Sequence, residues 1–143
     1  MRIFLLDAHT GELIEDYATG EGGWPLKLAT SAEGLLFYIE AGCKHIGMID
    51  FRNHGEEMTR VEPGHLVPVT ACETLRLKGE LTLISGDEGG LVRFSNLATG
   101  EVWGAIHVGA RITDIGIVHD CLGVATTSGL RCSTFTRERS RTD

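Results

Sequence analysis

Short segments rich in apolar residues follow one another along the chain, and glycine-centred turns separate these segments. Runs of this length that are rich in Leu, Ile, Val, Phe and Thr are typical of β-strands. No long segment shows the spacing of apolar residues that an amphipathic helix needs. The pattern predicts an all-β protein with strands at residues 2–7, 12–17, 26–31, 35–40, 45–51, 57–61, 67–74, 81–85, 91–97, 102–108, 112–118, 122–127 and 130–135.

Several of these predicted strands are apolar on both faces. Residues 81–84 read Leu-Thr-Leu-Ile, and residues 115–118 read Ile-Gly-Ile-Val. Strands of this kind belong to sheets that are covered on both sides. A β-propeller supplies such cover, because each four-stranded antiparallel blade packs between two others.

A sequence unit recurs along the chain with a period close to that of propeller blades. The triplet Thr-Gly-Glu occurs at residues 10–12 and again at residues 99–101, which is 89 residues further on. A weaker copy lies between them at residues 49–56, so that Asp7, Asp50 and Asn96 occupy equivalent positions 43 and 46 residues apart. The recurrence favours a repeat architecture.

One of the repeats resembles a WD40 repeat. Residues 85–96 read S-G-D-E-G-G-L-V-R-F-S-N, similar to the usual S-G-x-D-D-G-T-V-R-V-W-D, and His65 lies in a Gly-His dipeptide like the one that opens such repeats. The resemblance implies that His65 and Ser85 form a structural hydrogen bond. It also makes Asp50 and Asn96 structural repeat positions, equivalent to the Asp of the Trp-Asp pair.

The sequence also departs from the WD40 pattern. Ser95 stands in place of the Trp, and the turn Asp of the family's His-Ser-Trp-Asp hydrogen-bond set falls on Gly89. The full hydrogen-bond set is therefore not expected. Residues 99–103 also resemble the turn of quinoprotein-type repeats, which makes that class of propeller the second choice.

The WD40 resemblance implies an order for the strands in residues 1–136: two strands, then four, four and three, or about three blades. The last blade lacks its outer strand, a place that residues 12–17 could fill. Because known propellers have four or more blades, this arc needs completion by another copy or by further sequence. Two copies would supply 26 strands, close to the number in a ring of six or seven blades, so a homodimer and a segment of a longer propeller both remain possible.

Composition narrows the classes of partner. The net charge of −7 and only 13 Lys and Arg residues argue against nucleic acid. No apolar run is long enough to span a membrane, and the four cysteines show no disulfide framework, so a cytoplasmic location is expected. The polar residues 137–143 are expected to form a disordered tail.

The sequence holds no recognisable catalytic or cofactor motif. A nucleophile elbow and a phosphate-binding glycine loop are both absent. Asp87 and Glu88 fit a hairpin turn better than a calcium loop. Residues 43–45 and 119–121 each place a Cys and a His two residues apart, but without the spacing usual for zinc. We therefore expect neither enzymatic activity nor a metal or cofactor.

Two residues are candidates for contact with a partner. Trp24 and Arg111 lie in equivalent loops, each leading into the first strand of a predicted blade, and both residue types are frequent at binding hot spots. Trp24 could instead pack against Pro25 and the neighbouring blade. We expect a non-catalytic protein-interaction module that acts as a scaffold. The alternative is a propeller that binds a small molecule or a carbohydrate, assembled from short chains.

Overall fold

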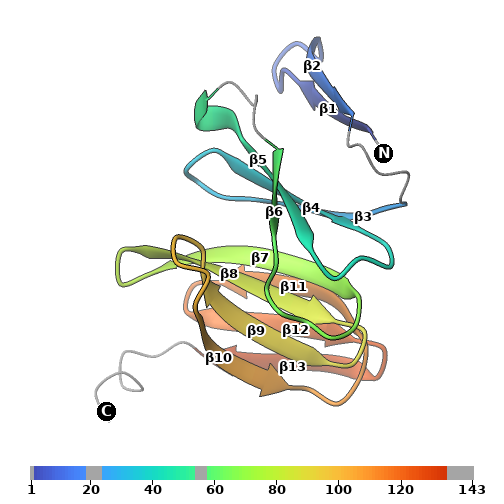
Figure 1. Ribbon diagram of the computed structural model, residues 1–143, viewed down its shortest axis with the longest axis vertical. Coiled ribbons are helices and arrows are strands. Elements are labelled where there is room, and N and C mark those ends of the chain that lie inside the picture. The colour runs from blue at the N-terminus through green and yellow to red at the C-terminus, as the bar shows by residue number, and fades with distance from the viewer. Residues whose placement is uncertain (1, 19–23, 54–57, 135–143) are drawn as a thin grey trace.

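The computed structural model describes residues 2–18, 24–53 and 58–134 of the chain (Figure 1). The described residues form thirteen strands and one 3-10 helix, without an α-helix. The polar tail predicted at residues 137–143 lies outside the described residues. The strands are β1 (Arg2–Leu6), β2 (Leu13–Ala18), β3 (Pro25–Thr30), β4 (Leu35–Glu40), β5 (Ile46–Asp50), β6 (Met58–Val61), β7 (Val69–Leu77), β8 (Glu80–Asp87), β9 (Leu91–Asn96), β10 (Val102–His107), β11 (Ile112–Val118), β12 (Cys121–Thr126) and β13 (Gly129–Thr134), and the 3-10 helix is η1 (Phe51–Asn53).

Each predicted strand has a counterpart in the structure, and the largest differences are at β7 and β8. These strands extend to a two-residue turn, where Lys78 and Gly79 have positive φ angles of 51° and 78°. Such a turn matches the twist of a hairpin and lets the strands pair up to the turn itself. Leu77 accordingly pairs with Glu80, and both strands are longer than the sequence pattern indicates.

The strands form a hairpin and three antiparallel sheets. β1 and β2 pair with each other, β3 to β6 form a four-stranded sheet, β7 to β10 form a second, and β11 to β13 form a three-stranded sheet. The predicted grouping of two, four, four and three is therefore confirmed. The described strands do not close into a barrel or a ring.

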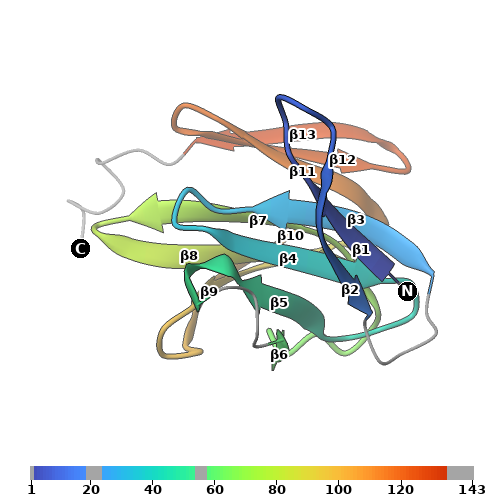
Figure 2. The ribbon, with the colours of Figure 1, turned by 90° about the horizontal axis from the view of Figure 1, so that it is seen from above.

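The three sheets stack on one another, with the first strand of each sheet nearest the next. β7 contacts β3 on one side and β11 on the other, and Figure 2 shows β3 and β7 running side by side. Apolar cores fill both interfaces between the sheets. Leu83 lies in the first core and Ile84 in the second, which explains why residues 81–84 are apolar on both faces.

The N-terminal hairpin covers the outer face of the first sheet. Ile3 packs with Tyr38 and Ile49, and the rings of Tyr17 and Phe51 meet edge to face with centroids 5.5 Å apart. β2 pairs with β1 and lies at the opposite end of the stack from β13 (Figure 1). Within one chain, residues 12–17 therefore do not complete the last sheet, because these contacts hold the hairpin against β4 and β5.

Two turns 89 residues apart have the same hydrogen bonds, as the sequence repeat indicates. Asp7 Oδ1 accepts from the amides two and three residues ahead, at 2.8 and 2.9 Å, and Asn96 Oδ1 does the same at 2.9 and 3.1 Å. Gly11 and Gly100, which follow in these turns, both have a φ of 75°. Asp50 accepts from the amide of Arg52 at 2.9 Å and pairs with its guanidinium. These positions shape turns, which is a structural role.

Candidate functional site

The loops that lead into the first strands of the three sheets lie along one side of the stack, where the strands end, together with neighbouring hairpin turns. We call this surface the rim and define it as residues 24, 41–45, 62–68, 88–90 and 108–111. Backbone hydrogen bonds of 2.8 to 3.0 Å join its loops in sequence: Ala41 to Trp24, Val69 to Cys43, Glu88 to Pro68, and Val108 to Gly90. The rim is therefore one connected surface contributed by all three sheets.

Buried hydrogen bonds of His65 hold the central loop of the rim, residues 62–68, against β8. His65 Nδ1 lies 2.7 Å from Asp87 Oδ2 and its Nε2 lies 2.7 Å from Ser85 Oγ, and all three residues are buried. A carboxylate can only accept, so Nδ1 carries the proton and Nε2 accepts from the Ser85 hydroxyl. The hydrogen bond between His65 and Ser85 that the sequence resemblance implies is present.

Asp87 completes this network, which contradicts the expectation that the turn carboxylate is missing. Its second oxygen, Oδ1, accepts from the amides of Gly89 at 2.8 Å and Leu91 at 3.0 Å. The sequence comparison placed this acid at position 89, which is a glycine. In the structure β8 continues to Asp87, and the carboxylate of Asp87, two residues earlier, reaches His65 instead. Ser95, at the position of the family's Trp, is buried and its hydroxyl has no hydrogen-bond partner.

The order Asp87, His65, Ser85 resembles a serine-hydrolase triad in its hydrogen bonds but not in its surroundings. A catalytic serine must meet a substrate carbonyl and an oxyanion hole. Ser85 has no exposed surface, because it lies in the middle strands of the stack. The three residues therefore hold the loop at residues 62–68 against β8, and we assign them no catalytic role.

The state of His65 predicts a dependence of stability on pH. Burial lowers the pKa of His65 below its ordinary value, although the Asp87 carboxylate acts in the opposite direction. Below about pH 6.5 the unfolded chain takes up a proton that the folded chain resists, so the free energy of unfolding should decrease, by up to about 1.4 kcal/mol per pH unit. Urea denaturation between pH 7 and pH 5 measures this slope. A wild-type slope no steeper than that of His65→Gln would contradict it.

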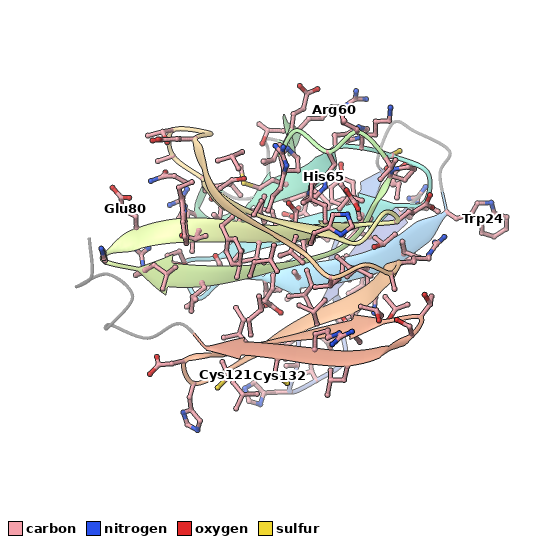
Figure 3. All side chains as sticks on the ribbon, turned by 90° about the horizontal axis from the view of Figure 1, so that it is seen from below. Trp24, Arg60, His65, Glu80, Cys121 and Cys132 are labelled. Atoms are coloured by element: carbon pink, nitrogen blue, oxygen red, sulfur yellow. The ribbon has the colours of Figure 1, made fainter. Side chains whose placement is uncertain are left out.

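Two apolar side chains of the rim are almost fully exposed. Leu66 is 86% exposed and Trp24 is 81% exposed. Figure 3 shows Trp24 pointing away from the sheets, so the alternative that it packs on a neighbouring blade is wrong within this chain. Sequence reasoning missed Leu66, because the burial of its neighbour His65, which turns it outward, is not visible in the sequence. The anchored loop holds Leu66 out toward solvent.

Arg111 lies on the same rim, in the loop before β11. Its guanidinium is 3.3 Å from the Glu88 carboxylate, and both side chains remain partly exposed. Trp24, Leu66 and Arg111 thus come from equivalent loops, which precede β3, β7 and β11. The structure brings all three to the same side of the stack. Each comes from a different sheet, and Leu66 comes from the middle one.

The described residues offer little for metal or thiol chemistry. No group of three His, Cys, Asp or Glu side chains among them could hold a metal ion. All four cysteines are free, and burial raises the pKa of Cys72 to about 12. A thiol with such a pKa is a poor nucleophile at neutral pH. The described part of the chain also contains no helix long and apolar enough to cross a membrane.

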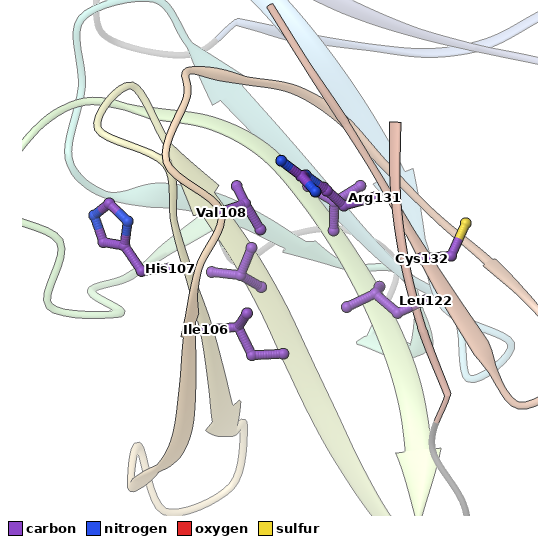
Figure 4. Close-up of a pocket in the computed structure, with 8 residues that line it drawn as sticks. Ile106, His107, Val108, Leu122, Arg131 and Cys132 are labelled. Atoms are coloured by element: carbon purple, nitrogen blue, oxygen red, sulfur yellow. The ribbon is translucent and has the colours of Figure 1, made fainter. Parts of the chain in front are cut away.

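A separate cleft of about 470 Å³ opens between the second and third sheets. It lies between β10 and β13, and Arg131 extends into it toward Val108 (Figure 4). Its lining contains no Phe, Tyr or Trp side chain. The lining residues are Val92, Ile106, His107, Val108, Leu122, Val124, Arg131 and Cys132.

Comparison with known proteins places the chain in no family. No protein-family model matches it, and a search of curated proteins finds no similar sequence.

Proposed function

We propose that this chain is a non-catalytic protein-interaction module and that its partner, another protein, docks on the rim. The observation that carries this proposal is the display of Leu66, an almost fully exposed leucine on a loop fixed by the buried bonds of His65. A loop whose backbone is already fixed loses little conformational entropy on binding, so more of the contact energy contributes to affinity. Trp24 and Arg111 add residue types that are frequent at hot spots.

The proposal includes the architecture: the three sheets are blades of a WD40-like propeller, and the arc is completed by a second copy or by further sequence. The grouping of two, four, four and three strands supports this, as do the adjacent first strands and the bond between His65 and Ser85. Rigid blades that carry short loops on one rim suit a scaffold. The four free cysteines favour a reducing compartment such as the cytoplasm.

Replacing Trp24 or Leu66 with alanine should separate binding from stability. Because both side chains are exposed, each substitution should change the free energy of unfolding by no more than about 0.5 kcal/mol. Truncation of a hot-spot residue should weaken partner binding by about tenfold or more. Chemical denaturation and a binding titration measure the two effects.

The direct test compares proteins captured by the immobilised wild-type chain, by a Trp24→Ala and Leu66→Ala double variant, and by a Thr99→Ala control. Thr99 is exposed in the β9–β10 turn, outside the rim. A protein retained by the wild type and the control, but lost from the double variant, is the expected result. Equal capture by all three chains would show that the rim is not the docking surface.

A further inference from the structure

The last sheet has a free edge beside an open cleft. β13 pairs with β12, and among the described strands nothing pairs with its other side, whereas both neighbouring sheets have four strands. An unpaired strand edge presents backbone donors and acceptors that readily bind another strand. The cleft lies between β10 and β13 (Figure 4), where a fourth strand of this sheet would run.

The N-terminal hairpin at the other end of the stack has an exposed apolar face. Ile3 and Tyr17 pair across the hairpin and pack toward the first sheet. Since side chains alternate along a strand, Phe4 lies on the face that points away from that sheet. Ile14 lies where the pairing shifts between Leu5 and Leu6, and its side chain is also exposed. Phe4 and Ile14 are 57% and 55% exposed, and Asp16, which pairs with Phe4 across the hairpin, shares the face of Phe4.

The two surfaces have complementary charge. Arg131 of β13 reaches into the cleft and makes no hydrogen bond or ion pair with the described residues. β2 carries two carboxylates, Glu15 and Asp16, and no basic residue. Arg2 of β1 pairs with Asp16, but it is the only Lys or Arg in residues 2–18, which hold four carboxylates, so the hairpin keeps a net negative charge. The chain's own residues 137–143 would be a poorer fit beside Arg131, because they contain three arginines.

We propose that β2 of a second copy of this chain pairs with β13 and closes the cleft. Phe4 and Ile14 of the second copy then contact the aliphatic side chains of the cleft, and its Asp16 lies near Arg131. The hairpin and the open sheet lie at opposite ends of each copy, so two copies can each donate one hairpin and accept the other about a two-fold axis. The inference rests on the part of the proposed function that completes the arc with a second copy. The cleft shares only Val108 with the rim and includes none of Trp24, Leu66 and Arg111, so the dimer and the docking of another protein can fail independently.

Light scattering on a sizing column, applied to the full chain at micromolar concentration, tests the proposal. The expected mass is near 31 kDa, twice the 15.5 kDa of the chain. Ile14→Lys and Arg131→Glu should each weaken the dimer by about tenfold or more. Adding Asp16→Arg to Arg131→Glu should restore part of the loss. The change removes the surface ion pair of Asp16 with Arg2 and places two arginines side by side, so the fold of this variant is checked as well.

Leu66→Lys is the matched control, because it places the same charge on an exposed leucine that lines neither the cleft nor the hairpin, and it should leave the dimer intact. Circular dichroism confirms that each variant is folded. A monomeric wild-type chain would overturn the proposal. A dimer that Ile14→Lys and Arg131→Glu leave unchanged would also overturn it, since the contact would then lie elsewhere. The same holds if Leu66→Lys weakens the dimer as much as these two variants do.

Discussion

Replacing His65 with alanine is expected to lower the free energy of unfolding by about 3–5 kcal/mol, because the change leaves a buried carboxylate without its partner. Asp87 would keep its two bonds to turn amides but lose the imidazole, and Ser85 would lose the acceptor of its hydroxyl proton. Neither group can turn to water, since both are buried. Such a loss is a large fraction of the stability of an ordinary domain. Denaturation in urea measures it.

His9→Ala is the control for this experiment. The His9 side chain is exposed, and only its backbone amide bonds to Asp7, so the substitution should change the free energy of unfolding by no more than about 0.5 kcal/mol. A second variant, Asp87→Asn, keeps the size of the side chain and should cost less than His65→Ala. If His65→Ala and His9→Ala had similar effects, the network would not be the anchor of the rim loop.

Gly90→Ala is the second substitution with a large expected effect. Gly90 has a φ of 88°, and an added Cβ would lie 2.7 Å from the carbonyl oxygen of Ala110 and 2.8 Å from its nitrogen. The left-handed backbone costs about 1–2 kcal/mol for a residue with a side chain. Overpacking against a fixed backbone adds about 1–3 kcal/mol. The free energy of unfolding should therefore decrease by about 3 kcal/mol, and the loop that carries Arg111 should shift.

Gly100→Ala separates these two contributions. Gly100 has a similar φ of 75°, but nothing lies within 4 Å of an added Cβ. Only the backbone penalty applies there, so the loss should be about 1 kcal/mol. The difference between the two variants measures how closely the β8–β9 turn packs against the β10–β11 loop. Equal losses would mean that the rim loops can move apart without cost.

The fold could be predicted from the sequence because its signals are local. Short apolar segments between glycine turns mark strands, and the Thr-Gly-Glu repeat marks the turn before the last strand of a sheet, at β1–β2 and again at β9–β10. The ends of β7 and β8 were harder to predict, because Lys78 is not a typical residue for positive φ. The position of the hairpin was also not predicted within one chain, since it depends on contacts of Ile3 and Tyr17 with residues of β4, β5 and η1 that are distant in the sequence.

The rim could be predicted only in part. Trp24 and Arg111 were found because their residue types and their places before strands are visible in the sequence. Leu66 was missed because an apolar residue in a loop usually packs inward, and only the burial of His65 shows that this one points out. Asp87 was missed as a partner of His65, because the family pattern places the acid two residues later. The register of β8 decides which carboxylate reaches the imidazole.

Photo-cross-linking at position 66 tests the central claim most directly. A photoreactive phenylalanine analogue replaces Leu66 in one chain and Ala98, in the turn before β10, in another. Light should attach a discrete protein partner at position 66 in cells that make this protein, and none at position 98, and adding Trp24→Ala should reduce the product. Equal cross-linking at both positions, or none at position 66, would contradict the account of the rim as the docking surface.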